Sequence, residues 1–339
     1  MMVIRPIRAN DYPALYQMAV ESGHGFTSLP VNEELLMRKI SRSEASFAKM
    51  TTTPGDEGYL FVLEDTSTGQ VCGTSALEAA VGLDDAFYHY HLGKVVHSSR
   101  SLGVYKTVDI LTLCNDYTGV SELCTLFLRP PFRQKHNGRL LSKMRFLFLA
   151  EFAERFSDKV IAELRGVSDA QGNSPFWQWL QEHFFSVDFP TADYLTGIGQ
   201  KVFIAELMPK YPIYVSLLSK VAQQVIGKVH EQTRPALALL ESEGFSCRGY
   251  VDIFDAGPTV EARTSHIRTI RESRRLKAKI GEVEGKTEPY LISNTALSGF
   301  RASWAELAPL ADSDDITLSP ALAKALQIDA GDWVRISKI

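Results

Sequence analysis

The residues whose types and spacing suggest chemistry most directly lie in one basic loop that contains a glycine. This loop reads RQKHNG over residues 133–138, and it follows an unbroken apolar run over residues 123–128 that is short enough for a buried strand. From Leu140 onward apolar residues recur at helical spacing, which predicts a helix over residues 137–156. A strand, a basic loop and a helix N-terminus together form an anion-binding cradle, because free amide N–H groups and the helix dipole favour negative charge there.

The histidines are the next candidates for chemistry. His230 precedes a helix that Thr233 can cap, and its imidazole titrates near neutral pH, so it can move a proton; a surface histidine without such a role is the alternative. His89, His91 and His97 lie close in sequence, but no HExxH frame or neighbouring thiolate accompanies them. The four cysteines are far apart and form no CxxC pair, so we expect no metal site.

Composition bounds the class of protein. The chain has 339 residues, of which 45% are hydrophobic and 22% charged, as in an ordinary soluble globular protein. A net charge of −4 provides no field that attracts nucleic acid or an acidic membrane, so neither is expected as a partner. The N-terminus lacks the apolar core of a signal peptide, no run of about 18 apolar residues occurs, and the scattered cysteines suit a reducing compartment. These features predict a cytoplasmic protein.

The elements that position these residues mix helices and strands without strict alternation. A first strand near the N-terminus precedes two helices and a hairpin over residues 59–80, and further strands are expected over residues 159–164 and 201–207. Residues 82–120 predict extra strands or a long excursion. This order predicts an α+β (mixed α/β) fold around a central mixed sheet. The basic loop matches neither GxGxxG nor GxxxxGK(S/T), which argues against dinucleotide and nucleoside-triphosphate sites.

The chain divides by sequence pattern into three parts. Residues 1–262 hold the large mixed unit, and residues 263–287 are so rich in charge that they predict a connecting segment. Residues 288–339 predict a small β-rich module with a short helix over residues 321–326.

The basic loop and a later segment resemble acyl-CoA N-acyltransferases of the GNAT superfamily. That superfamily opens the helix after a strand with R/Q-x-x-G-x-G/A, which this chain matches at Arg133 and Gly138. His136 stands where the first glycine usually lies, and its Cβ would crowd a phosphate that a glycine admits. Residues 236–250 resemble the closing helix and strand of the same fold. The resemblance implies a GNAT-like fold in residues 1–262, with a CoA pyrophosphate in the cradle.

Segments along nearly the whole chain resemble the arginine N-succinyltransferase family and keep its order. They include MMVIRP at the N-terminus, YLFVLED from residue 59, NGRLLSK from residue 137, FIAELMPKYPIY from residue 203 and YVDIFDAGPT from residue 250. The resemblance implies transfer of the succinyl group of succinyl-CoA to the α-amino group of L-arginine, the first step of the arginine succinyltransferase pathway of arginine degradation. It implies small-molecule substrates, succinyl-CoA as co-substrate and no tightly bound cofactor, while a homo- or hetero-oligomer stays open.

The resemblance also implies which residues act. His230 matches the family's catalytic histidine, which is a proton donor. Leu126 matches a position that binds succinyl-CoA, and a backbone contact suits it because its side chain is apolar. The residues expected to bind the CoA pyrophosphate are those of the loop and the helix start: Arg133, Asn137, Gly138 and Arg139.

The acceptor side of the reaction needs acidic groups. An amine attacks only when neutral, so a base must remove a proton from the arginine ammonium. Glu122, Glu163 and Glu206 are candidates because each lies in or beside an apolar segment, where burial would raise its pKa; each can instead bind the substrate guanidinium. A structural pair with Arg165 or Lys201 is the alternative. Arg165 is also a candidate partner for the succinyl carboxylate.

Two other functions stay open at this level. Ornithine or another basic amino acid can replace arginine as the acceptor in the same chemistry. A non-catalytic regulator that binds CoA or an acyl carrier is the second, and His136 at a glycine position favours it.

Overall fold

The computed structural model describes residues 1–23, 26–169, 171–200, 202–310 and 313–339. Its strands are β1 (Met2–Pro6), β2 (Gly58–Asp65), β3 (Gln70–Glu78), β4 (His89–Ser99), β5 (Val104–Cys114), β6 (Ser121–Leu128), β7 (Lys159–Glu163), β8 (Ile213–Tyr214), β9 (Ser246–Val251), β10 (Pro258–Arg263), β11 (Arg274–Ile280), β12 (Glu288–Asn294), β13 (Ala302–Leu307), β14 (Asp315–Leu318) and β15 (Trp333–Lys338). Its α-helices are α1 (Tyr12–Ser22), α2 (Glu33–Ala48), α3 (Asn137–Glu151), α4 (Pro175–Leu180), α5 (Phe189–Gly197), α6 (Val202–Leu207), α7 (Lys220–Val225), α8 (Arg234–Ser242), α9 (Arg268–Glu272) and α10 (Pro320–Leu326).

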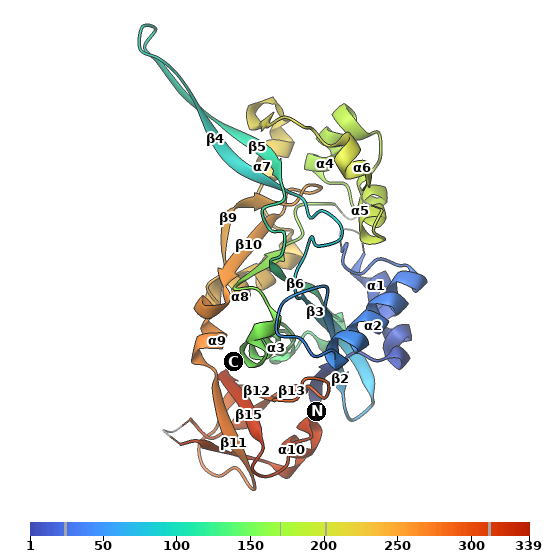
Figure 1. Ribbon diagram of the computed structural model, residues 1–339, viewed down its shortest axis with the longest axis vertical. Coiled ribbons are helices and arrows are strands. Elements are labelled where there is room, and N and C mark those ends of the chain that lie inside the picture. The colour runs from blue at the N-terminus through green and yellow to red at the C-terminus, as the bar shows by residue number, and fades with distance from the viewer. Residues whose placement is uncertain (24–25, 170, 201, 311–312) are drawn as a thin grey trace.

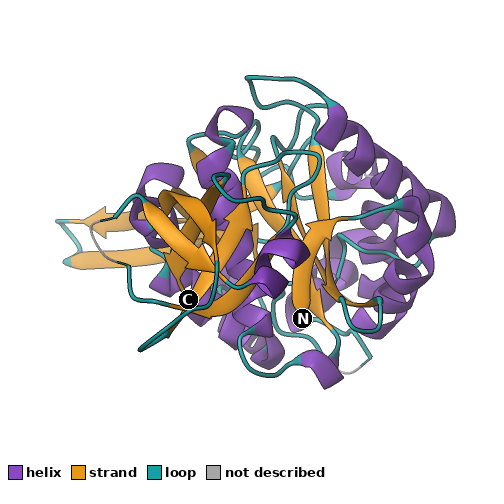
Figure 2. Cartoon of the chain, turned by 90° about the horizontal axis from the view of Figure 1, so that it is seen from below, coloured by secondary structure: helices purple, strands orange, loops and turns teal. Residues whose placement is uncertain are grey.

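The described strands form one continuous sheet in the order β14-β11-β15-β12-β13-β1-β2-β3-β6-β7-β10-β9-β4-β5-β8. Most neighbours are antiparallel, whereas β6–β7 and β11–β14 are parallel. Seen from below, strands run through the middle of the molecule with helices on both sides (Figure 2). The predicted α+β class with a central mixed sheet is therefore confirmed. No helix among the described residues is long and apolar enough to cross a membrane.

The centre of the sheet is covered on both faces because the side chains of a strand point alternately to opposite sides. In β2, Leu60 and Val62 join the apolar cluster of α1 and α2. Phe61 and Leu63 join the other cluster, which contains the apolar residues of α3. Figure 1 shows α1 and α2 beside one face of β2 and β3, with α3 across the sheet from them. This sandwich fixes α3, and with it the basic loop, against the strand that precedes it.

Several predicted elements are confirmed, and one predicted strand is wrong. The hairpin over residues 59–80 is β2–β3, and residues 82–120 contain the β4–β5 hairpin, which projects far from the body (Figure 1). The helix expected over residues 137–156 ends earlier, at Glu151. The strand expected over residues 201–207 is wrong, since residues 202–207 form α6 and Lys201 lies outside the described residues. Of α6 only Ile204 is buried, so its apolar side chains do not mark a buried strand.

The C-terminal strands form a small sheet that continues the large one through β13 and β1. The predicted helix over residues 321–326 is α10. Residues 263–287 are more than a connection, because they contain α9 and β11, and β11 pairs with β14 and β15. The many charged residues of this segment made the strand difficult to predict from sequence. Leu276 and Ala278 are buried while their neighbours are exposed, as in a strand with one face toward solvent. The proposed boundaries of the three parts stay a prediction.

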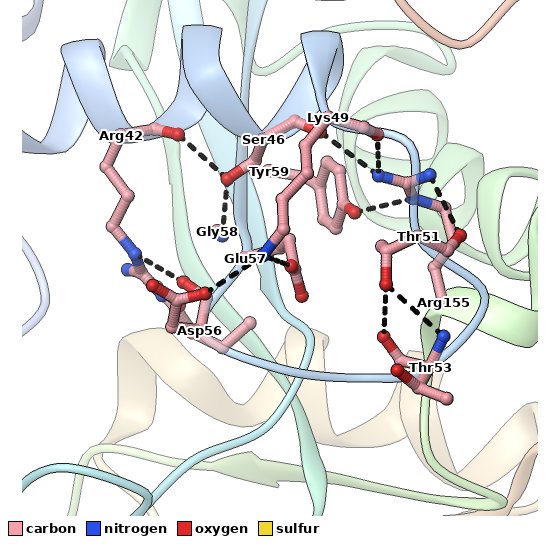
Figure 3. Close-up of polar contacts among 11 residues, drawn as sticks. Arg42, Ser46, Lys49, Thr51, Thr53, Asp56, Glu57, Gly58, Tyr59 and Arg155 are labelled. Carbon is pink, nitrogen blue, oxygen red and sulfur yellow. Dashed lines mark hydrogen bonds and ion pairs between the residues drawn. The ribbon is translucent and has the colours of Figure 1, made fainter.

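A buried arginine ties the end of α2 to the segment after α3 (Figure 3). The Arg155 side chain is buried and donates to the Tyr59 hydroxyl at 2.7 Å, to the Lys49 carbonyl at 2.7 Å and to the Ser46 carbonyl at 3.1 Å. The last carbonyls of a helix have no N–H donor within the helix itself. Arg155 therefore supplies donors to the Tyr59 hydroxyl and the Ser46 carbonyl, which would otherwise be buried without these partners.

Replacing Arg155 by Leu should lower the free energy of unfolding by about 3 kcal/mol, because several buried acceptors lose their donor together. Tyr59→Phe is the matched control: it removes one of these hydrogen bonds and should cost about 1 kcal/mol. Urea denaturation of both variants measures the difference. Equal losses in the two variants would contradict the role given to Arg155.

Candidate active site

A cleft of about 1060 Å³ opens where two parallel strands stop pairing. Strands β6 and β7 are paired at Ser121–Val160 and Glu122–Ile161, and the residues that follow in both strands line the cleft. Where parallel strands part, the backbone N–H and C=O groups of their facing edges lose their ladder partners. The cleft wall thus offers backbone donors and acceptors to a ligand that enters between the strands.

A bulge bends β6 beside this opening. Its register with β3 shifts between Thr74 and Ala76, and Thr125 has a φ of 53°, which is uncommon for a residue other than glycine. Leu126 follows directly, lines the cleft and packs its half-buried side chain on the cluster around α3. Side-chain packing and a backbone contact with a ligand are therefore compatible at Leu126.

The basic loop and the first turn of α3 form one end of the cleft. Arg133, Gly138 and Arg139 line it, together with Gln134 and Lys135. The N–H groups of Gly138 and Arg139 belong to the first turn, where a helix has no internal acceptors for them. This end of the cleft combines cationic side chains with a helix N-terminus, as an anion site requires.

Gly138 is needed for neither backbone conformation nor packing. Its φ is not positive, and a Cβ built on it would meet no atom within 4 Å. The space above Gly138 is therefore open to the cleft, which fits close approach of a ligand to the backbone.

Two loop residues face away from the cleft. The Asn137 side chain is buried and donates to the Phe132 carbonyl at 3.0 Å, and its N–H donates to the Gln134 carbonyl at 3.2 Å. Asn137 thus holds the loop together. The His136 ring packs edge-on against Trp304 of β13, with ring centroids 4.8 Å apart. Neither residue is among those that line the cleft.

His230 lies next to Arg165. Its N–H donates to the Arg165 carbonyl at 2.9 Å, and its Nδ1 accepts from the Gln232 N–H at 3.2 Å. Burial, and then the charge of Arg165, lower the pKa of His230 below its usual 6.5. A neutral ring whose Nδ1 accepts carries its proton on Nε2. Gln232 and Thr233 line the cleft, whereas His230 is not among its lining residues.

The acidic residues gather at the junction of the cleft with a neighbouring hollow of about 380 Å³. Glu122, Glu163 and Asp252 line both spaces, and Glu163 also pairs with the buried His89 at 2.8 Å. The third predicted glutamate is misplaced: Glu206 lies exposed on α6, away from the cleft, because the predicted strand is a helix.

Sequence reasoning missed Asp252 and Asp255. Burial, then the charges of Asp255 and Glu163, raise the pKa of Asp252 well above its usual value. Asp255 accepts from the Gly166 N–H at 2.6 Å and the Gly257 N–H at 2.8 Å, so it fixes the backbone beside Arg165. A sequence signal existed in DAGPT at residues 255–259, but alone it indicates a turn and not a site.

Comparison with known proteins gives consistent results. A family model described as "Arginine N-succinyltransferase beta subunit" matches residues 2–269, and one for its C-terminal domain matches residues 274–338. Proteins named arginine N-succinyltransferase from Escherichia coli (strain SE11) and Shigella flexneri are 49% identical over 340 residues, covering 100% of this chain and 98% of theirs. The solved structure of arginine/ornithine succinyltransferase subunit AI from Pseudomonas aeruginosa is 40% identical, with a TM-score of 0.92, covering 100% of this chain and 98% of that one.

Replacing Gly138 by Ala should weaken CoA binding about tenfold or more, because the new methyl group fills the space next to the first-turn amides. The free energy of unfolding should stay the same or rise by up to about 1 kcal/mol, since alanine favours the helix. Gly93→Ala is the control, because its Cβ meets only the Ile110 side chain, at 3.6 Å, in the projecting hairpin. Calorimetric titration with CoA checks the effect, and unchanged affinity in the Gly138 variant would contradict it.

Proposed function

The chain belongs to the arginine N-succinyltransferase family, and from this membership we propose that it transfers the succinyl group of succinyl-CoA to the α-amino group of L-arginine. The products are CoA and N2-succinyl-L-arginine, the first step of the arginine succinyltransferase pathway. One observation supports the proposal most: a single cleft joins an anion-binding helix N-terminus, the parted edges of β6 and β7, and an acidic wall.

Each end of the cleft suits one substrate. The CoA pyrophosphate binds at the amides of Gly138 and Arg139, with the charge of Arg133 beside it. The amide-rich arm of CoA then runs between β6 and β7, where its own amides meet the unpaired strand edges and the Leu126 backbone. No cofactor beyond this co-substrate is needed for acyl transfer.

The acidic wall suits a basic amino acid. Glu122 and Glu163 can bind the guanidinium, for which carboxylates are the preferred partners. The raised pKa of Asp252 makes this carboxyl a better proton acceptor than an ordinary aspartate, as removal of a proton from the substrate ammonium requires. The neutral amine then attacks the thioester carbonyl, the carbon–sulfur bond breaks, and the sulfur leaves as a thiolate. The nitrogen gives up its second proton as the amide forms, and that proton balances the one that converts the thiolate to the free thiol of CoA.

His230 acts on that leaving thiolate. Its lowered pKa keeps the ring neutral near pH 7, and the Nε2–H that results can donate to the sulfur. A thiol has a pKa of about 8.5, so a hydrogen bond already provides much of the stabilisation that the leaving group needs.

The surroundings of the reaction are also part of the proposal. We propose that the protein works in the cytoplasm, because its cysteines are free thiols and its substrates are small metabolites. The Pseudomonas aeruginosa relative is named as a subunit, and we propose by analogy that this chain acts within an oligomer.

His230→Ala should lower turnover at least about tenfold while CoA binding is retained, because the thiolate loses its donor. His230→Asn is the matched variant: His230 caps the short turn Glu231–Thr233 through Nδ1, and asparagine is a good cap, so stability should be kept while turnover still falls. In the unsubstituted protein, protonation of the ring below pH 6.5 should not by itself lower the rate, because the charged ring keeps its Nε2–H donor. Full turnover in the asparagine variant would remove His230 from the chemistry.

Release of free thiol from succinyl-CoA tests the function itself. Thiol should appear at a rate that depends on L-arginine, and mass spectrometry should identify N2-succinyl-L-arginine in equal amount. Absence of arginine-dependent thiol would favour the non-catalytic regulator. Competition between arginine and ornithine at equal concentration decides the preferred acceptor.

A further inference from the structure

We propose that Arg165 binds the terminal carboxylate of the acyl group and so makes the site select a dicarboxylic acyl thioester over a neutral one. This inference rests on the proposed function and adds to it the residue that recognises the acyl group. Arg165 follows β7 directly and lines the cleft.

Arg165 is a half-buried cation of the cleft that has spare donors. Its Nη2 donates to the Ser168 hydroxyl at 2.9 Å, but its buried Nε has no hydrogen-bond partner, and it forms no ion pair with the described residues. By contrast, Lys143 and Arg268 both pair with Glu243.

The remaining cleft arginines are less suited to the acyl carboxylate. Arg145 is buried with its donors on the Ser142 carbonyl and hydroxyl and on the Cys124 carbonyl. Arg133, Lys135 and Arg139 lie at the pyrophosphate end. Arg165 therefore remains as the cation that can receive a second anion.

The charges of Asp255 and Asp193 act on Arg165, but neither carboxylate forms an ion pair with it in the part of the chain that the structure describes. Both oxygens of Asp255 accept backbone N–H groups, and Asp193 accepts from the Thr27 hydroxyl. Burial lowers the pKa of the Arg165 guanidinium even though Asp255 and Asp193 oppose that shift. A partly desolvated cation without a hydrogen-bonded anion is unfavourable, so an incoming carboxylate gains more here than it would in water.

The position of Arg165 fits the length of the acyl chain. Its carbonyl accepts the N–H of His230, so it lies beside the group that serves the leaving sulfur. The free carboxylate of a succinyl group is separated from the thioester carbonyl by a short chain of carbon atoms, so its partner must lie close to the reacting centre. A guanidinium suits this role because its paired donors match a carboxylate.

The test compares succinyl-CoA with butyryl-CoA, which has the same four carbons but no carboxylate. In Arg165→Met, kcat/KM for succinyl-CoA should fall about 100-fold or more, because a charged partner is lost. The kcat/KM for butyryl-CoA should change much less, so the ratio of kcat/KM for succinyl-CoA to that for butyryl-CoA should fall sharply. Arg165→Lys should retain part of the preference for succinyl-CoA, since lysine keeps the positive charge but lacks the paired donors of the guanidinium. Thermal unfolding of both variants shows whether they are folded.

Arg139→Met is the control at the CoA end, and it should lower kcat/KM for both thioesters by the same factor. The proposal is overturned if Arg165→Met also lowers both equally, or if it raises the KM for arginine while the acyl preference stays. Calorimetric binding of the two thioesters separates this inference from the proposed function. A preference for succinyl-CoA that Arg165→Met abolishes would support the inference even if no transfer to arginine occurred, and equal affinities in the unsubstituted protein would refute it.

Discussion

The parting of β6 from β7 is the constraint on which the site depends. Parallel neighbours in a sheet normally stay paired along their length, because each unpaired backbone group that is kept from water costs free energy. Here pairing ends after two residue pairs, and both strands are held from their outer sides instead, β6 by β3 and β7 by β10. The bulge at Thr125 turns β6 at this point. The opening is thus built into the register of four strands and does not depend on a mobile loop.

Buried charge holds the helices around that opening. Lys143 of α3 pairs with Glu243, which follows α8 and also accepts the N–H of Thr269 in α9. Burial would raise the pKa of Glu243, but the Thr269 N–H and Lys143 outweigh it, and the pKa is lowered. A buried pair of this kind adds little net stability, yet removing one partner is costly, so it fixes a unique arrangement of three helices. Residues of all three helices line the cleft.

The sequence allowed the fold class, the strand–loop–helix unit and most strands to be predicted, because apolar spacing reports local structure directly. Apolar spacing predicted the wrong structure for α6, a short helix with one buried side chain. It also did not predict β11, because only two residues of that strand are buried. The site was harder to predict because its members come from distant segments. Glu122 and Glu163 were found as charges in apolar strands, whereas Asp252 becomes unusual only when folding brings Asp255 and Glu163 beside it.

His136 shows how the loop accommodates a side chain at a position that the superfamily pattern gives to glycine. A Cβ there would crowd a phosphate only if the ring pointed into the cleft. The ring instead packs on Trp304, and the neighbouring Lys135 takes a left-handed φ of 49° that helps the backbone turn. Trp304 belongs to β13, which pairs with β1 and so extends the main sheet. The small C-terminal sheet therefore supplies the surface on which the His136 ring packs. The cradle stays open because Trp304, which is far away in the sequence, holds that ring outside it.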